Sequence, residues 1–410
     1  MKIFIIKRVV GILFLLLIIS NGCKKILSPE LQGQISVSNL VTTQSGIMTL
    51  VNGVYNPLID MYNGTLSRLT DLASNDGWTP RVENDPDYLA VGPGFNFTTN
   101  FWSGSYKGIV NANAVLANAD AVPDFSSVAI KNSVKGQSYF LRAFYYFNLV
   151  RLFGGVPLIL NQVNSQDDAQ QPRASMEDVY AQIKNDLDSA IALLPPSYNG
   201  SMNQEVGRAT SYSAIALKTL VYLETNEWAN AAAAANSIIS SNKFSLQGIY
   251  ANNFNGSAEN GSQSLFEVQY SATAGSYGNL YQLFAPAAAP YSSGFTIAPT
   301  DDSLVIGGVG GPNRGGQSFV QAFESGDLRK NTIITAYNIP NVLQSGRAAG
   351  TLYYVNKYLN ITTPAGQSPW NVPVIRYAEI LLAGAEALNE TSYVADGPAF
   401  NMLNEVRQKA

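Results

Sequence analysis

The strongest hydrophobic pattern in the chain lies between Tyr139 and Leu152 and predicts a helix that is buried on all sides. Its apolar residues recur at helical spacing on two faces, so little of the circumference is polar. One face carries Phe140, Phe144, Phe147 and Val150, and the other carries Leu141, Tyr145, Leu149 and Leu152. Gly154-Gly155 predicts the end of this helix, and Val156 before Pro157 favours an extended exit. We therefore expect a helix packed among other helices.

Shorter helical patterns precede and follow this segment. Pro57 is expected to limit the first of them, and Pro195-Pro196 to end another that begins with a capping-box-like Ser175 and Asp178. Small residues from Ala231 to Ala235 predict a helix face that a neighbour can approach closely. The expected helices cover residues 46–55, 106–121, 175–194, 210–224 and 228–240, followed by a pair that starts at residue 376 and restarts after residue 397.

Two long regions lack sustained periodicity and are rich in Gly, Ser, Asn and Pro. They cover residues 60–105 and 244–375, with short strand-like pieces at 265–270 and 352–358. Loops of this length within a compact domain are usually functional. The predicted fold is mainly α: tetratricopeptide-like helical hairpins form a right-handed α superhelix that supports a loop-rich part with a few short strands. The helical scaffold is expected at 106–241 and 376–410.

The N-terminus has the pattern of a secretory lipoprotein signal. Lys2, Lys7 and Arg8 precede an apolar run that ends before Cys23, the single cysteine of the chain. This run is too short to span a bilayer as a helix. We therefore expect a signal peptide at 1–22, lipidation of Cys23, a tether at 23–45 and one domain at 46–410.

Charge and composition exclude several function classes. The net charge is −4, and removal of the three basic residues in the signal makes it −7, which argues against nucleic acid as a partner. The chain contains no histidine, so the commonest general base and most zinc sites are absent. Residues 311–318 have P-loop spacing but carry Gln317 in place of the lysine. No cofactor and no metal are expected.

Paired carboxylates leave a glycosidase as a further alternative. The pairs are Asp71 with Asp76, Asp85 with Asp87, and Asp301 with Asp302. Each pair lies in an expected loop, where Asp is favoured for forming turns. The turn interpretation is preferred, and the chain is not expected to be an enzyme.

Aromatic residues are concentrated in the two loop-rich regions, where amide and charged side chains accompany them. Sugar rings stack on aromatic planes while Asn, Asp and Arg bond the hydroxyl groups, so this combination suits glycan binding. For any single residue, clamping of a loop onto the core is an equally good interpretation. The candidate ligand-binding residues are Asn75, Asp76, Trp78, Arg81, Tyr88, Trp102, Tyr277, Tyr291, Phe295 and Arg314.

The segment FLRAFYYFNLVRLFGGVPL resembles the signature of the SusD/RagB family, outer-membrane lipoproteins that help Bacteroidetes capture nutrients. Similar blocks follow in the family's order at 214–223, 228–231, 264–269, 327–330 and 375–389. The resemblance implies a lipoprotein held in the outer membrane through Cys23 and facing the cell exterior. It would capture an oligosaccharide and deliver it to a SusC-like TonB-dependent transporter.

Two points stay open within this resemblance. The alternative is a helical-repeat lipoprotein that binds peptide or protein rather than glycan. Family members continue past the block around residues 401–407, so a chain that stops at Ala410 is expected to be truncated at its C-terminus, with apolar surface exposed on its last helix pair.

Overall fold

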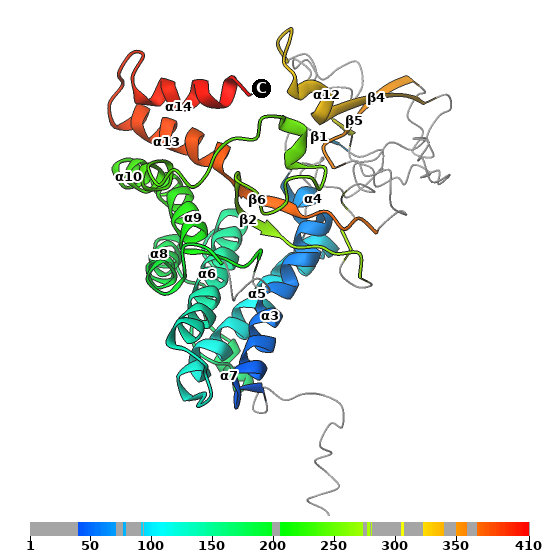
Figure 1. Ribbon diagram of the computed structural model, residues 1–410. Helices are drawn as coiled ribbons and strands as arrows, with labels where there is room; N and C mark the ends of the chain where they lie inside the picture. The colour runs from blue at the N-terminus through cyan, green and yellow to red at the C-terminus, as the bar shows by residue number, and fades with distance from the viewer. Residues whose placement is uncertain are drawn as a thin grey trace, which may run out of the picture.

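The computed structural model describes residues 40–70, 77–78, 92, 94–198, 206–273, 277–278, 280, 305–306, 323–339, 350–358 and 367–409. Helices dominate, and the strands are short (Figure 1). The longer helices are α3 (Gln44–Asp60), α5 (Asn96–Asn118), α6 (Val128–Phe153), α8 (Met176–Leu193), α9 (Ser211–Glu224), α10 (Trp228–Ile239), α13 (Tyr377–Thr391) and α14 (Pro398–Arg407). The short helical segments are η1 (Met61–Thr65), α4 (Leu66–Thr70), η3 (Ala119–Ala121), α7 (Gln166–Ala169), η5 (Tyr250–Asn253) and α12 (Arg329–Ile333). The strands are β1 (Gly77–Trp78), β2 (Ser264–Val268), β3 (Val305–Ile306), β4 (Ile334–Ile339), β5 (Gly350–Val355) and β6 (Val372–Arg376).

The long helices pack as a continuous stack in which each contacts the next. Contacts run from α3 to α5, then through α6, α8, α9 and α10, and finally from α10 to α13 and α14. Figure 1 shows this stack on the side away from β1, β4 and β5. Sequential packing of helical pairs is the pattern of tetratricopeptide-like repeats, so the prediction of a mainly α fold built from helical hairpins is confirmed.

Helix α6 lies at the centre of the stack and is buried on nearly every side, as its sequence pattern predicts. Phe140, Leu141, Tyr145 and Tyr146 are among the largest fully buried side chains. The helix ends at Gly154, whose φ of 72° lies in the region that favours glycine. The aromatic residues of this helix therefore form core rather than ligand-binding surface.

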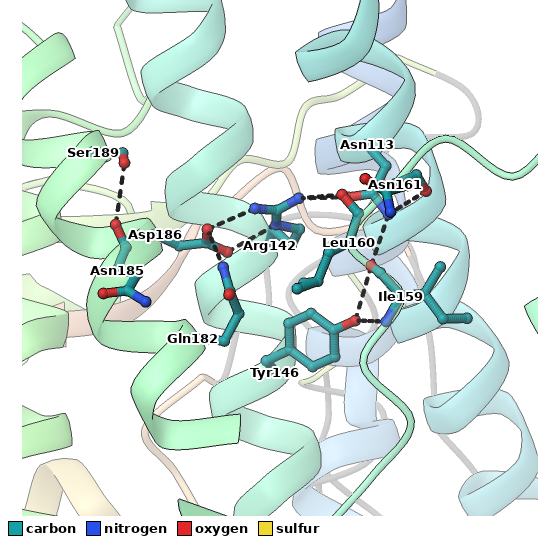
Figure 2. A network of polar contacts seen from close by, with 10 residues as sticks. All are labelled: Asn113, Arg142, Tyr146, Ile159, Leu160, Asn161, Gln182, Asn185, Asp186 and Ser189. Atoms are coloured by element: carbon teal, nitrogen blue, oxygen red, sulfur yellow. Dashed lines mark hydrogen bonds and ion pairs between the residues drawn. The ribbon is translucent and has the colours of Figure 1, made fainter. Parts of the chain in front are cut away.

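A buried polar network fastens α6 to its neighbours (Figure 2). The Arg142 guanidinium donates to both carboxylate oxygens of Asp186, over 2.8 Å and 2.6 Å. It also donates to Asn113 Oδ1 over 2.7 Å and to the Leu160 carbonyl over 3.1 Å. The Tyr146 hydroxyl bonds both the amide and the carbonyl of Ile159. Arg142 and Tyr146 therefore hold the chain that leaves α6 against this helix, and Arg142 also links α6 to α5 and α8.

Pro57 lies inside α3, so the prediction that it ends the first helix is wrong. A proline lacks the N–H that would bond the carbonyl four residues earlier, here that of Gly53. The Asn111 side-chain amide on α5 donates to that carbonyl over 2.8 Å. A side chain from another helix thus replaces the missing backbone donor, and the helix continues to Asp60.

Two stretches assigned to the first loop-rich region are helical. Residues 61–70 form η1 and α4, and residues 96–105 form the first part of α5. The start of α5 contains poor helix formers, namely Asn96, Thr98, Thr99 and Asn100. The local sequence therefore does not predict a helix here. Burial of Phe101 against the core stabilises this turn of helix instead.

The other expected helix boundaries agree with the structure. The Ser175 hydroxyl accepts from the Asp178 amide over 3.0 Å and caps α8, which ends before Pro195. Thr210 caps α9 in the same way. A Cβ placed on Gly384 of α13 would lie 3.1 Å from the Cβ of Ala235, so small residues do allow α10 and α13 to approach closely. Helix α14 packs on α13 and has no fully buried residue.

Candidate functional site

A four-stranded antiparallel sheet joins the two loop-rich regions. Its strand order is β1-β3-β5-β4, so β1 from the first region pairs with β3 from the second. Trp78 pairs with Val305, which in turn pairs with Tyr354 on β5. Two aromatic residues far apart in sequence are thus placed in one row across three strands. Figure 1 shows β1, β4 and β5 at the upper right, on the side of the molecule away from α8, α9 and α10.

Tyr277 lies beside a second connection within the loop-rich part. Its neighbour Gly278 forms a two-way bridge with Ser368, with N···O distances of 2.7 Å and 3.1 Å. Tyr277 is half-buried next to this bridge. Trp370, two residues beyond Ser368, packs on Gly256, where an added Cβ would lie 2.5 Å from its ring. Trp370 therefore has a packing role, as the alternative interpretation of single aromatic residues allowed.

Trp102 lies on α5, within the helical scaffold rather than in a loop. Its ring centroid is 5.1 Å from that of Tyr106 and 5.1 Å from that of Phe153, which it meets edge-on. Tyr106 also donates its hydroxyl to the Pro157 carbonyl over 2.8 Å. Trp102 is therefore part of a half-buried aromatic group, and its contact with a ligand stays a prediction.

The remaining candidate residues lie outside the described residues, as does the side chain of Trp78. They are Asn75, Asp76, Arg81, Tyr88, Tyr291, Phe295, Arg314 and the lipidation site Cys23. The carboxylate pairs considered for a glycosidase also lie there. Their roles remain predictions.

Carboxylate and amide side chains form a hydrogen-bond network beside the strand pair β2–β6. Asn371 donates its side-chain amide to Glu267 and Gln269, over 3.1 Å and 2.9 Å. The backbone amide of Asn371 donates to Glu259 over 2.7 Å. Burial raises the pKa of Glu259, and the neighbouring Glu267 carboxylate raises it further. This network joins the loop before β2 to the strand pair β2–β6.

A polar pocket of about 540 Å³ lies between α3, η1 and α5. Sequence reasoning did not identify it, because residues 60–105 were expected to be loop and the polar positions of α3 look like ordinary solvated surface. The available signal is the stripe on α5 at positions i, i+3, i+4 and i+7, where all side chains are polar or absent. That stripe consists of Asn100, Ser103, Gly104 and Lys107, and Asn56, Asp60 and Asn63 face it from α3 and η1.

The described residues contain no group of three or more His, Cys, Asp or Glu side chains placed to hold a metal ion. In the same part of the chain, no helix combines the length and apolarity needed to cross a bilayer.

The protein thus consists of stacked helical pairs and a loop-rich part, whose two regions are joined by a small sheet. These features define a tetratricopeptide-like scaffold protein. Sequence comparison places this scaffold in a family. A family model described as starch-binding and associating with the outer membrane matches residues 34–223, and the SusD family model matches residues 330–410. The chain belongs to the SusD/RagB family.

Curated relatives match over most of the chain. SusD-like protein P38 of Formosa agariphila is 24% identical over 445 residues, covering 97% of this chain and 81% of the relative. SusD-like protein P2 of the same organism is 27% identical over 417 residues, covering 96% of this chain and 80% of the relative.

Solved structures share the fold. Surface glycan-binding protein A from Bacteroides uniformis has a TM-score of 0.74 at 22% identity, covering 90% of this chain and 81% of that chain. A laminarin-binding SusD-like protein has a TM-score of 0.72 at 22% identity, with coverages of 90% and 84%. A structure with a xylogluco-oligosaccharide has a TM-score of 0.70 at 23% identity, with coverages of 88% and 75%.

Proposed function

We propose that this protein binds an oligosaccharide on its loop-rich side and delivers it to a SusC-like TonB-dependent transporter in the outer membrane. The pairing of β1 with β3 carries the proposal, because it brings the two aromatic loop-rich regions into one sheet. Family membership supports it, since relatives of the same fold include a laminarin-binding protein and a complex with a xylogluco-oligosaccharide. Trp78, Tyr277 and Tyr291 would supply stacking surfaces, and Asn75, Asp76, Arg81 and Arg314 would bond the sugar hydroxyls.

Calorimetric titration of the domain with laminarin and xyloglucan oligosaccharides tests the binding step. Removal of one stacking ring is expected to weaken binding by roughly tenfold, which corresponds to about 1.4 kcal/mol. The variants are Trp78→Ala and Tyr291→Ala. Tyr393→Ala is the matched control, because Tyr393 is 66% exposed and lies between α13 and α14. Unchanged affinity in both loop variants would remove this site, and binding of peptides without glycans would favour the peptide alternative.

Anchoring and delivery require separate tests. The single cysteine, Cys23, is proposed to carry the lipid that holds the protein on the outer membrane. A Cys23→Ser variant should be absent from the outer-membrane fraction and should no longer incorporate labelled palmitate. Co-purification of a TonB-dependent transporter with the tagged wild-type protein tests the partner. Recovery of the protein without such a transporter, under conditions that keep outer-membrane complexes intact, would contradict the delivery step.

A further inference from the structure

The polar pocket between α3, η1 and α5 is built by an unusual backbone. A kink at η1 separates α3 from α4, where Asn63 at φ −84°, ψ 29° and Gly64 at φ 109° depart from helical geometry. Because Gly64 tolerates a positive φ, the chain can make this sharp turn. Here the turn brings Asn63 and Thr65 to the rim of the pocket that α5 closes from the other side.

Small and apolar groups leave room inside the pocket. Gly104 lines it from α5, and a Cβ at this position would lie 3.9 Å from Pro57 Cβ, which is ordinary van der Waals contact. Pro57 and Met61 are buried and provide an apolar surface on the α3 side. The volume of about 540 Å³ lies within the range of small-ligand sites.

Several polar groups around the pocket are available to a ligand. Among the described residues, the side chains of Asn56, Asp60, Asn100 and Lys107 make no hydrogen bond or ion pair to one another or to other protein groups. Asn56 and Asn100 each offer both donors and an acceptor. Asp60 and Lys107 contribute one charge of each sign, so the lining has no net charge.

This chemistry favours one class of ligand. A phosphate or carboxylate would call for excess positive charge, and an amine for excess negative charge. A neutral molecule with many hydroxyl groups can bond the amides, the carboxylate and the ammonium together. None of the described residues that line the pocket is aromatic, so such a ligand would be held by hydrogen bonds at its edges and by contact with Pro57.

We propose that this pocket is a second saccharide subsite, which takes a single neutral sugar unit and is separate from the aromatic loop-rich side. The proposal rests on the proposed function in taking a saccharide as ligand. It adds a site on the helical scaffold. This site lies on a different side of α5 from Trp102, whose ring contacts Tyr106 and Phe153.

The test measures binding of D-glucose, D-galactose, D-mannose and D-xylose, each added separately to the whole domain. Saturation-transfer NMR detects binding, and titration gives the Kd. Gly104→Leu fills the pocket without a clash at Cβ. Asn100→Ala removes one amide, and Asn185→Ala is the control, because Asn185 is an exposed helical asparagine on α8. At least one sugar is expected to bind, and its Kd is expected to rise by about tenfold or more in both pocket variants, with little change in the control.

The outcomes separate this proposal from the proposed function. If no probe binds the wild type, or if Gly104→Leu and Asn100→Ala bind as the wild type does, the subsite is excluded even where oligosaccharides bind the loops. If a monosaccharide binds in the pocket while oligosaccharides fail to bind at all, the subsite stands and the loop-side function falls. Lys107→Ala replaces Gly104→Leu if that variant does not fold. A Trp78→Ala, Tyr291→Ala double variant is expected to keep the monosaccharide site.

Discussion

The side-chain amide of Asn111 lies 2.8 Å from the carbonyl oxygen of Gly53, the acceptor that Pro57 leaves without a backbone donor. Replacement of Asn111 by Ala should therefore expose an unsatisfied, partly buried carbonyl and reduce the free energy of unfolding by about 1–3 kcal/mol. Urea denaturation followed by circular dichroism measures the change. The control is Asn185→Ala on α8, which should have little effect.

A double-mutant cycle makes this argument specific. In a Pro57→Ala background, the residue at 57 regains an N–H that can bond the Gly53 carbonyl. Loss of Asn111 should then cost clearly less than it does in the wild type. Equal costs in the two backgrounds would show that Asn111 acts through some other contact.

Two glycines on α5 should respond in opposite ways to alanine. A Cβ on Gly108 would lie 2.2 Å from the ring of the fully buried Tyr145, whereas a Cβ on Gly104 would make ordinary van der Waals contact with Pro57 Cβ at 3.9 Å. Gly108→Ala is expected to destabilise the fold by about 1–3 kcal/mol or more. Gly104→Ala is expected to stabilise it by up to about 1 kcal/mol, because alanine favours helix. Thermal unfolding of both variants checks this, and a destabilised Gly104→Ala would contradict the assigned geometry.

The buried Arg142–Asp186 pair should be costly to break on one side only. Arg142→Met leaves the Asp186 carboxylate buried without its main partner, and a loss of about 3–5 kcal/mol is expected. The double variant Arg142→Met, Asp186→Leu should recover much of this loss. Arg151→Met is the control, because the Arg151–Glu224 pair is 50% and 37% exposed. Its loss should cost about 1 kcal/mol or less.

Glu379 on α13 predicts a dependence of stability on pH. Burial raises the pKa of Glu379 above its ordinary value of 4.5, although the Arg376 and Arg151 guanidinium groups oppose the shift. Because the folded state then binds the proton more tightly than the unfolded state, this group stabilises the fold at acid pH. The contribution is lost as pH rises from 4.5 towards the folded pKa.

The Glu379→Gln variant should remove that dependence. Its stability relative to the wild type should increase as pH rises above about 4.5, as measured by urea unfolding from acid to neutral pH. Glu386→Gln on the exposed side of the same helix is the control and should follow the wild-type profile. A parallel profile for Glu379→Gln and the wild type would contradict the role assigned to burial.

The regular parts of the fold could be predicted because their signals are local. The spacing of Phe140, Phe144 and Phe147 identifies a buried helix, and Ser175 and Thr210 mark where two helices begin. The path of the chain at Pro57 could not be predicted, because the compensating donor, Asn111, comes from another helix. The start of α5 was missed for a similar reason: tertiary burial of Phe101 outweighs weak local propensity.

The candidate site, like the fold, could be predicted only in part from the sequence. The concentration of aromatic residues in two regions is visible in sequence, but two-residue strands such as β1 and β3 carry no periodic signal that would reveal their pairing. The pocket lined by Gly104 lies between α3, whose polar positions look like ordinary solvated surface, and the start of α5, which was expected to be loop. Only the approach of α3 and α5 in space brings Asn56, Asp60 and Lys107 to one pocket.

The short pairing of β1 with β3 also has a consequence for the order of folding. The helices of the stack make mostly neighbouring contacts and can form early, whereas β1 and β3 must close a very long loop before they gain any contact. The loop-rich side should therefore assemble last and open first. A saccharide that contacts both regions would bind only after the sheet has assembled and would stabilise that state. Its binding should therefore slow opening of the sheet more than it slows unfolding of the helices.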